Sequence, residues 1–158
     1  MAPPLHDAVL AYAALLGTWL GRGRGEYPTI EPFDYDETAT FSHLGKPFLA
    51  YAQRSVAVSD GRPLHSESGY LRSPQPGRVE LVVAQPTGVV EVDEGTFDGT
   101  TIRLTSTAVL RTGSAVEVTA ITRVLTIDGD ELRYELGMAA VGQPLTHHLA
   151  ATLHRVGI

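Results

Sequence analysis

The sequence predicts an all-β protein, a ten-stranded antiparallel up-and-down barrel preceded by a short N-terminal helix. Three observations support this prediction. Apolar residues follow a helical spacing only near the N-terminus, apolar and polar residues alternate in the runs that follow, and turn signals separate those runs at intervals of about eight to twelve residues. The strands are expected at 18–25, 33–43, 47–57, 64–72, 78–84, 88–93, 101–106, 116–126, 131–140 and 145–155.

The expected helix runs from Asp7 to Leu16. Its apolar residues recur at helical spacing, at Leu5, Val9, Tyr12 and Leu16. Gly17 follows as a stop signal, because glycine favours the backbone conformation in which helices end.

Alternation with a period of two indicates strands whose two faces meet different surroundings. Three runs show it: Phe33, Tyr35, Glu37, Ala39 and Phe41; Val116, Val118, Ala120 and Val124; and Leu132, Tyr134, Leu136 and Met138. The turn signals between runs are Asp60-Gly61, Gln75-Pro76-Gly77, Pro86-Thr87-Gly88, Asp98-Gly99, Thr112-Gly113 and Asp128-Gly129-Asp130. Because these residue types suit tight reversals, consecutive strands are expected to form hairpins.

The short links favour a barrel over a sandwich. A sandwich would need a long Greek-key crossover, and none is evident between the expected strands. Closure removes exposed sheet edges, and a ten-stranded barrel is wide enough to keep an interior cavity. The helix would cover one open end. No repeat or linker divides the chain, so residues 1–158 are expected to form one domain.

Composition and charge exclude several classes of protein. The 158 residues are 43% hydrophobic and 19% charged, which is typical of a globular domain. The net charge is -6 and no basic patch stands out, so nucleic acid is not an expected partner. The first residues lack a basic region and carry too short an apolar stretch for a membrane span, so we expect a cytoplasmic protein with no membrane partner. The absence of cysteine excludes disulfides, thiolate metal sites and cysteine nucleophiles.

The last expected strand is the most informative segment for chemistry, because it carries three of the six histidines. In a regular strand one face would carry Thr146, His148, Ala150, Thr152 and His154. That face is small and polar, whereas a packed core needs bulkier apolar groups, so it would leave room for a flat ligand beside an imidazole. Spacing alone leaves open the alternative that these histidines are hydrogen-bonded or surface residues.

A glycine-rich run follows the expected helix and reads Gly17-Thr18-Trp19-Leu20-Gly21-Arg22-Gly23. It is not a dinucleotide-binding fingerprint, because the glycines of that motif form the turn between a strand and a helix. Here the chain leaves a helix and enters a strand, where alternate glycines permit close backbone approach or a sharp bend. Gly17, Trp19, Gly21 and Gly23 are therefore expected to form a structural motif, with Trp19 closing the barrel floor.

Several segments together resemble the nitrobindin family. They are Gly17-x-Trp19-x-Gly21-x-Gly23, Tyr27-Pro28-Thr29-Ile30, Phe33-x-Tyr35, Gly45-Lys46-Pro47-Phe48-Leu49, Leu64-His65-Ser66-Glu67-Ser68-Gly69-Tyr70-Leu71-Arg72 and His148-Leu149-Ala150-Ala151-x-Leu153-His154-Arg155. The resemblance extends from about Leu15 to Arg155, with the segments in order and without large gaps. Nitrobindins are ten-stranded barrels similar in architecture to fatty-acid-binding proteins, and they bind heme b through one histidine.

The resemblance implies a cofactor, an activity and partners. It implies one heme b per chain, binding of nitric oxide at the iron, and a heme-dependent peroxynitrite isomerase activity that converts peroxynitrite to nitrate. Dimerisation is seen in relatives, so the resemblance also allows a homodimer.

The resemblance also implies the site residues. His148 matches the family's axial ligand of the heme iron and would act in catalysis through that iron. Thr29 matches a loop near the heme and is a candidate for the side opposite the ligand. Arg123 matches a basic position that meets the heme, where its guanidinium would bind a propionate; otherwise it is an ordinary surface arginine. His154 matches a family position too, but as a cavity-wall or hydrogen-bonding residue without an iron contact.

The residue types present agree with a histidine ligand. Protein ligands of heme iron are His, Cys, Met or Tyr. The chain has no cysteine, Met1 is terminal, and Met138 alternates with apolar strand residues. Two other functions remain open. The barrel could carry a fatty acid or other apolar ligand, with Arg123 and Tyr134 holding its carboxylate, or the heme could serve as a nitric oxide sensor or store without catalysis.

Overall fold

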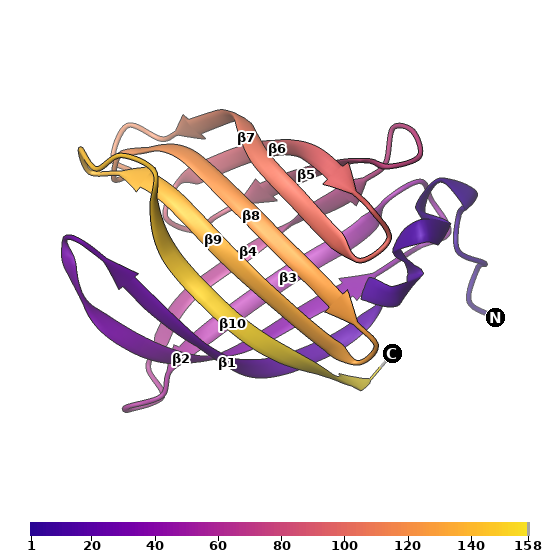
Figure 1. Cartoon of the computed structure of the whole chain (residues 1–158), viewed down its shortest axis with the longest axis horizontal. Coiled ribbons are helices and arrows are strands. Elements are labelled where there is room, and N and C mark those ends of the chain that lie inside the picture. Colours follow the sequence, from indigo (N-terminus) through magenta and orange to yellow (C-terminus); the bar gives the residue numbers. More distant parts are fainter. Residues whose placement is uncertain (158) are drawn as a thin grey trace.

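The computed structural model describes residues 1–157 and confirms the predicted architecture (Figure 1). Ten antiparallel strands close into one barrel in the order β1-β10-β9-β8-β7-β6-β5-β4-β3-β2, so each strand pairs with its sequence neighbours and β10 closes the ring against β1. The elements are a 3-10 helix η1 (Asp7–Leu15), β1 (Gly17–Tyr27), β2 (Ile30–Ser42), β3 (Leu49–Ala57), β4 (Pro63–Arg72), β5 (Arg78–Ala84), β6 (Val89–Phe97), β7 (Thr101–Arg111), β8 (Val118–Asp128), β9 (Glu131–Ala140) and β10 (Thr146–Gly157). Across residues 1–157, no helix has the length and apolar character needed to cross a membrane.

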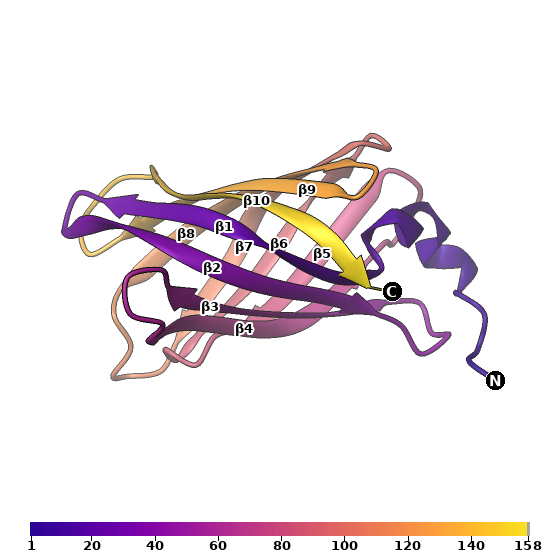
Figure 2. The ribbon, with the colours of Figure 1, turned by 90° about the horizontal axis from the view of Figure 1, so that it is seen from below.

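The helix η1 lies across one end of the barrel (Figure 2). An apolar layer beneath it closes this end. Val9, Tyr12 and Leu15 of η1 are buried. Trp19, near the start of β1, has no exposed surface, and its indole Nε1 donates to the carbonyl of Leu15 at 2.8 Å. The layer continues through the strands with Leu49, Leu71, Val79, Ile102, Leu132 and Leu153. The predicted closure of this end by the helix and Trp19 is confirmed.

Arg155, near the end of β10, attaches η1 to the barrel. Its guanidinium donates to the carbonyl of Leu16 and, at 2.7 Å, to the carbonyl of Ala14. It also donates to Asp130 at 2.8 Å and lies over the Trp19 ring, 4.4 Å from the centroid. Carbonyls at the end of a helix have no partner within the helix, so Arg155 satisfies groups that would otherwise need water.

The glycines of β1 allow a close approach between strands. A Cβ at Gly21 would lie 2.0 Å from the carbonyl oxygen of Thr152 on β10. A Cβ at Gly23 would lie 2.3 Å from the ring of Tyr35 on β2. Gly17 has φ 124° where the chain leaves η1. The structural interpretation of this motif is therefore confirmed.

Among the shifts in strand register, those in β8 and β10 each correct a prediction. In β8 the register against β9 shifts between Val118 and Ala120. Beyond the shift the residues that line the interior are Ile121, Arg123 and Leu125. The predicted run of Val116, Val118, Ala120 and Val124 therefore does not share one face. A β-bulge places an extra residue in one strand and exchanges the two faces beyond it.

The second departure lies in β10, whose register against β9 shifts between His147 and Leu149. Beyond it the residues that pack in the interior are Leu149, Ala151 and Leu153. The intervening residues Ala150, Thr152 and His154 lie on the outer face, and His154 is exposed. The predicted small, cavity-facing side of this strand is therefore wrong beyond His148.

Truncation of Trp19 tests the closed end. Replacing Trp19 with alanine should lower the free energy of unfolding by about 3–5 kcal/mol, because it removes a fully buried aromatic side chain. The control Leu20→Ala, at an exposed neighbour, should change it by no more than about 0.5 kcal/mol. Urea unfolding followed by circular dichroism measures both, and equal losses would contradict the role of Trp19 in closing the barrel.

Candidate functional site

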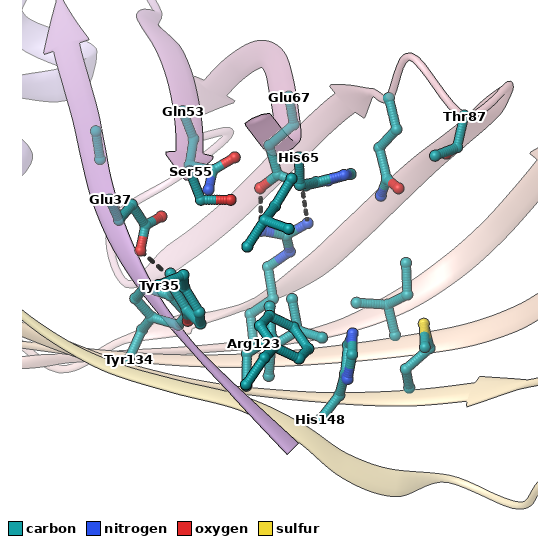
Figure 3. Close-up of a pocket in the computed structure, with 18 of the residues that line it drawn as sticks. Tyr35, Glu37, Gln53, Ser55, His65, Glu67, Thr87, Arg123, Tyr134 and His148 are labelled. Carbon is teal, nitrogen blue, oxygen red and sulfur yellow. Dashed lines mark hydrogen bonds and ion pairs between the residues drawn. The ribbon is translucent and has the colours of Figure 1, made fainter. Parts of the chain in front are cut away.

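The end of the barrel opposite η1 opens into a cavity of about 590 Å3 (Figure 3). The hairpin turns at this end surround the mouth, where Ile30, Arg62, Thr87 and Val116 are among the lining residues. A cavity of this size and a largely apolar wall are typical of sites that enclose a small molecule or cofactor.

His148 projects into the cavity because it is the extra residue of the bulge in β10 (Figure 3). Its Nδ1 lies 3.0 Å from the carbonyl oxygen of Glu26 at the end of β1. A carbonyl only accepts, so the imidazole hydrogen is on Nδ1 and Nε2 keeps a free lone pair. The ring of Tyr27 packs edge-on against the imidazole at 5.3 Å between centroids. The side chain is thus oriented for Nε2 to bind a metal centre.

The protonation state of His148 suits that role. Burial lowers the pKa of the imidazole, and the charges of His147 and His65 lower it further, while the hydrogen bond to Glu26 acts in the opposite direction. A lowered pKa keeps the ring neutral at neutral pH, which is the form that ligates iron.

The other histidines differ in position. His147 is exposed, with its Nε2 4.0 Å from a carboxylate oxygen of Glu26. His154 lies on the outer face, so the cavity-wall position expected for it is wrong. His43 accepts a hydrogen bond from the backbone of Gly45. Of the six, only His65 and His148 line the cavity.

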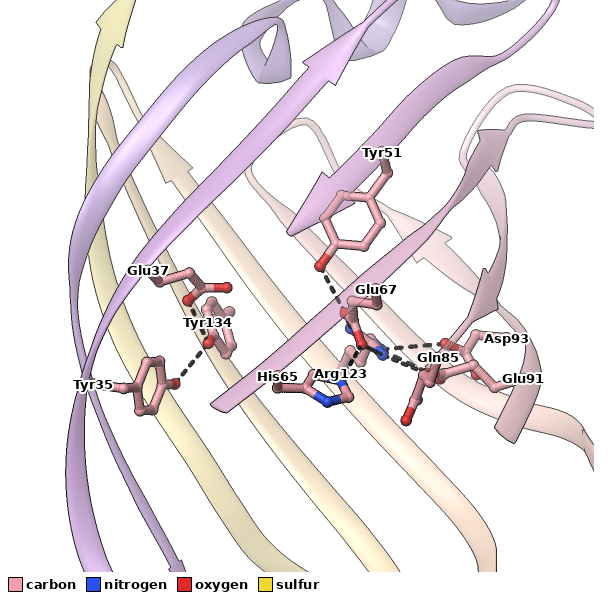
Figure 4. A network of polar contacts seen from close by, with 10 residues as sticks. All are labelled: Tyr35, Glu37, Tyr51, His65, Glu67, Gln85, Glu91, Asp93, Arg123 and Tyr134. Atoms are coloured by element: carbon pink, nitrogen blue, oxygen red, sulfur yellow. Dashed lines mark hydrogen bonds and ion pairs between the residues drawn. The ribbon is translucent and has the colours of Figure 1, made fainter. Parts of the chain in front are cut away.

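Arg123 is buried, so it is not a surface arginine, and its donors are already occupied (Figure 4). It binds Glu67 through two bonds, of 2.7 and 3.2 Å. It also binds Glu91 through two bonds, one of them 3.3 Å, and its Nε lies 3.5 Å from Asp93. A fatty-acid carboxylate or a heme propionate would have to displace one of these groups, so the geometry does not favour either at Arg123. Arg62 is the other arginine that lines the cavity, and it lies at the mouth.

The carboxyl groups around Arg123 have opposite pKa shifts. Burial would raise the pKa of Glu67, but the charge of Arg123, together with hydrogen bonds from His65, Arg123 and Tyr51, holds it well below its usual range. Burial is the largest cause that raises the pKa of Asp93 to about 9, and the neighbouring charge of Glu91 raises it further. Asp93 therefore holds a proton at neutral pH, so it adds no negative charge to the carboxylates that surround Arg123.

Sequence reasoning missed a second polar group in the cavity. The Tyr134 hydroxyl donates to Glu37 at 2.6 Å and lies 2.6 Å from the hydroxyl of Tyr35. The hydroxyl hydrogen of Tyr134 is therefore used in the bond to Glu37 and is not available to a ligand carboxylate. His65, which lies 3.3 Å from Glu67, was missed as well. The signal was present in the run from Phe33 to Phe41, where Glu37 stands on the otherwise apolar inner face.

Thr29 lies exposed in the turn between β1 and β2 and is not among the residues that line the cavity. The next residue, Ile30, is at the mouth. A contact between Thr29 and a bound cofactor stays a prediction.

These features define the class of closed β-barrels with an interior cavity of a size that encloses a small molecule, here with the imidazole of His148 in its wall. The chain belongs to the THAP4-like, heme-binding beta-barrel domain family, whose profile matches residues 8–155. The resemblance that the sequence segments indicated is thereby confirmed.

Individual relatives agree over nearly the whole chain. The chain is 58% identical to peroxynitrite isomerase 1 of Mycolicibacterium paratuberculosis, over 98% of this chain and 99% of that protein. It is 53% identical to peroxynitrite isomerase of Nocardia farcinica, over 96% and 92%. Among solved structures, the crystal structure of Rv2717c from M. tuberculosis superposes with a TM-score of 0.91 at 52% identity, covering 97% of this chain and 99% of that one.

The buried proton on Asp93 predicts a specific pH dependence of stability. A carboxyl group whose pKa rises from 3.8 to about 9 on folding stabilises the protein fully below about pH 3.8, and this stabilisation is lost as the pH rises toward 9. Each unit of pKa shift corresponds to about 1.4 kcal/mol. The isosteric variant Asp93→Asn should therefore become progressively more stable than the parent between pH 4 and 9. Urea unfolding at several pH values measures this difference. The surface control Asp36→Asn should show no such trend. If the free energy of unfolding of Asp93→Asn changed with pH in the same way as that of the parent, the buried proton on Asp93 would be excluded.

Proposed function

We propose that this chain binds heme b through Nε2 of His148 and isomerises peroxynitrite to nitrate. The observation that carries the proposal is the hydrogen bond from His148 Nδ1 to the Glu26 carbonyl, which leaves Nε2 free inside a cavity of suitable size. Membership of a heme-binding family and relatives named peroxynitrite isomerase support it.

The residues of the cavity fit such a cofactor. Phe33, Leu64 and Leu149 are among the apolar side chains that would contact a porphyrin. Arg62, at the mouth, is the basic residue we assign to a propionate. Its side chain is exposed and, among residues 1–157, forms an ion pair only with Asp60 of the same turn. Thr29, in the neighbouring turn, would approach the rim of the cofactor.

When bound, ferric heme would supply a Lewis acid for the peroxo oxygen of the substrate. The chain supplies the surroundings. His148 presents a neutral imidazole whose orientation Glu26 and Tyr27 fix. The apolar walls exclude water and keep the fragments of the substrate together until nitrate forms. Because Arg123 is already paired with carboxylates, the deeper cavity offers no counter-charge that would retain the nitrate anion.

Nitric oxide is a second ligand that this site would take. A heme held by His148 alone would supply an iron able to bind a small ligand, and a largely apolar cavity admits a small neutral molecule. Reversible nitric oxide binding without peroxynitrite turnover would identify a sensor or store instead of an enzyme.

Substitution of the ligand tests heme binding. His148→Ala should abolish the Soret band of the hemin-reconstituted protein and weaken hemin binding by more than about 100-fold, because it removes the axial ligand. His147→Ala and His154→Ala are matched controls on the same strand, and they should keep the Soret band and the affinity for hemin. A colourless parent protein that rejects hemin but takes up lipid would select the carrier function.

The activity is tested by stopped-flow mixing of peroxynitrite with the ferric holoprotein. The decay of peroxynitrite should accelerate in proportion to the holoprotein concentration, and nitration of free tyrosine in the same solution should fall. The heme-free chain and His148→Ala should leave both unchanged. Decay no faster than in buffer would rule out the isomerase proposal.

A further inference from the structure

Three side chains that line the cavity form a hydrogen-bonded series that the proposed heme site does not use (Figure 4). Tyr134 donates to Oε2 of Glu37 at 2.6 Å, and the hydroxyls of Tyr134 and Tyr35 are 2.6 Å apart. Because the hydrogen of Tyr134 is committed to Glu37, the Tyr35 hydroxyl is the donor in the other bond. The series runs from Tyr35 through Tyr134 to Glu37.

We propose that Tyr35, Tyr134 and Glu37 form a relay that reduces nitrogen dioxide inside the cavity. The proposal rests on the proposed function, since cleavage of the O–O bond of peroxynitrite is the source of nitrogen dioxide, a one-electron oxidant. Tyr35 gives one electron to nitrogen dioxide, which becomes nitrite. The Tyr35 proton moves to the oxygen of Tyr134 as the proton of Tyr134 moves to the Glu37 carboxylate. The products are nitrite, a Tyr35 phenoxyl radical and a protonated Glu37, so atoms, electrons and charge balance.

The arrangement suits a coupled transfer of proton and electron. A phenol that loses an electron must also lose its proton, and the nearest acceptor for Tyr35 is reached over two short hydrogen bonds. Tyr35 and Glu37, at the two ends of the series, are buried, and Tyr134 between them is half-buried. Burial is the largest cause that raises the pKa of Glu37 to about 7, so this carboxylate accepts a proton near neutral pH.

A glycine on the neighbouring strand makes the first bond of the series feasible. A Cβ at Gly23 would lie 2.5 Å from the hydroxyl oxygen of Tyr35, which is too close for any side chain. The ring of Tyr35 therefore occupies the space that a side chain at Gly23 would fill. This assigns a chemical role to the last glycine of the motif in β1, in addition to its structural one.

A second tyrosine–glutamate pair in the same cavity serves as an internal comparison. Tyr51 also donates to a buried glutamate, Glu67, at 2.7 Å. Glu67, however, is paired with Arg123, and this charge holds its pKa well below the usual range. Tyr51 has a comparable phenol–carboxylate contact with a much poorer proton acceptor, so we expect nitrogen dioxide to oxidise Tyr35 in preference to Tyr51.

The experiment exposes the heme-free full-length chain to nitrogen dioxide generated by radiolysis of a nitrate solution, which bypasses the isomerase reaction. Tyr70→Phe serves as the parent background, because Tyr70 is an exposed tyrosine that would react directly. Time-resolved absorbance reports the phenoxyl radical, and electron paramagnetic resonance of a frozen sample identifies it. Peptide mapping then locates 3-nitrotyrosine, which forms when a second nitrogen dioxide combines with the radical.

In this background the radical and the nitration should concentrate on Tyr35. Since positioned proton transfer contributes about 10²–10⁴-fold to a reaction rate, Glu37→Gln should slow radical formation by at least about tenfold, and Tyr35→Phe should remove the signal. Gly23→Ala, which displaces the hydroxyl of Tyr35, should act like Glu37→Gln. Tyr51→Phe is the matched control and should leave the signal unchanged.

Equal nitration of Tyr35 and Tyr51, or an unchanged rate in Glu37→Gln, would overturn the relay. Near-ultraviolet circular dichroism and hemin titration of each variant establish that the barrel is folded, so a lost signal is not mistaken for unfolding. The relay and the isomerase activity can be rejected independently of each other. A Tyr35 radical in the radiolysis experiment, with no accelerated decay of peroxynitrite by the holoprotein, supports the relay and rejects the isomerase.

Discussion

One extra residue in β10 determines which histidine enters the cavity of this barrel. Leu149, Ala151 and Leu153 face the interior, so regular alternation would turn His147 inward and His148 outward. The shift in register at this point reverses the two histidines. The recorded pairing of β1 with β10 ends at Gly25 and Leu149, and the carbonyl of Glu26, one residue further along, accepts from the imidazole. The bulge therefore places His148 in the cavity and also orients its imidazole.

The second constraint on the interior is its charge. Arg123 is held by Glu67 and Glu91 within a barrel wall that is otherwise largely apolar, and its removal would leave buried carboxylates without a partner. A shift in register in β8 turns this arginine inward, just as the shift in β10 turns His148 inward. Both shifts occur against β9, one on each side of it. The bulge in β10 thus places an imidazole near the mouth of the cavity, and the bulge in β8 places an ionic cluster deeper in the barrel.

Period-two alternation and turn residues were sufficient to predict the ten strands, and helical spacing of apolar residues was sufficient to predict the N-terminal helix, because these depend on local sequence. The faces of β8 and β10 were not predictable in this way, since an added residue in one strand leaves no mark on composition. Arg123 was recognised as a site residue, but its partners come from β4 and β6, and pairing between distant strands is not visible in a single sequence. Glu37 could have been found, because a carboxylate on an apolar face is a direct indication of a buried polar group.

The start of β1 and the end of β10 lie together beside η1, at the end of the barrel remote from the mouth (Figure 1). The N-terminal segment and the end of β10 at Gly157 therefore lie away from the entrance to the cavity. An affinity tag, a fluorescent reporter or a surface linker fused at either end would leave the hairpin turns around the mouth unobstructed. Attachment to an electrode or bead through either of these segments would leave the mouth of the cavity facing the solution.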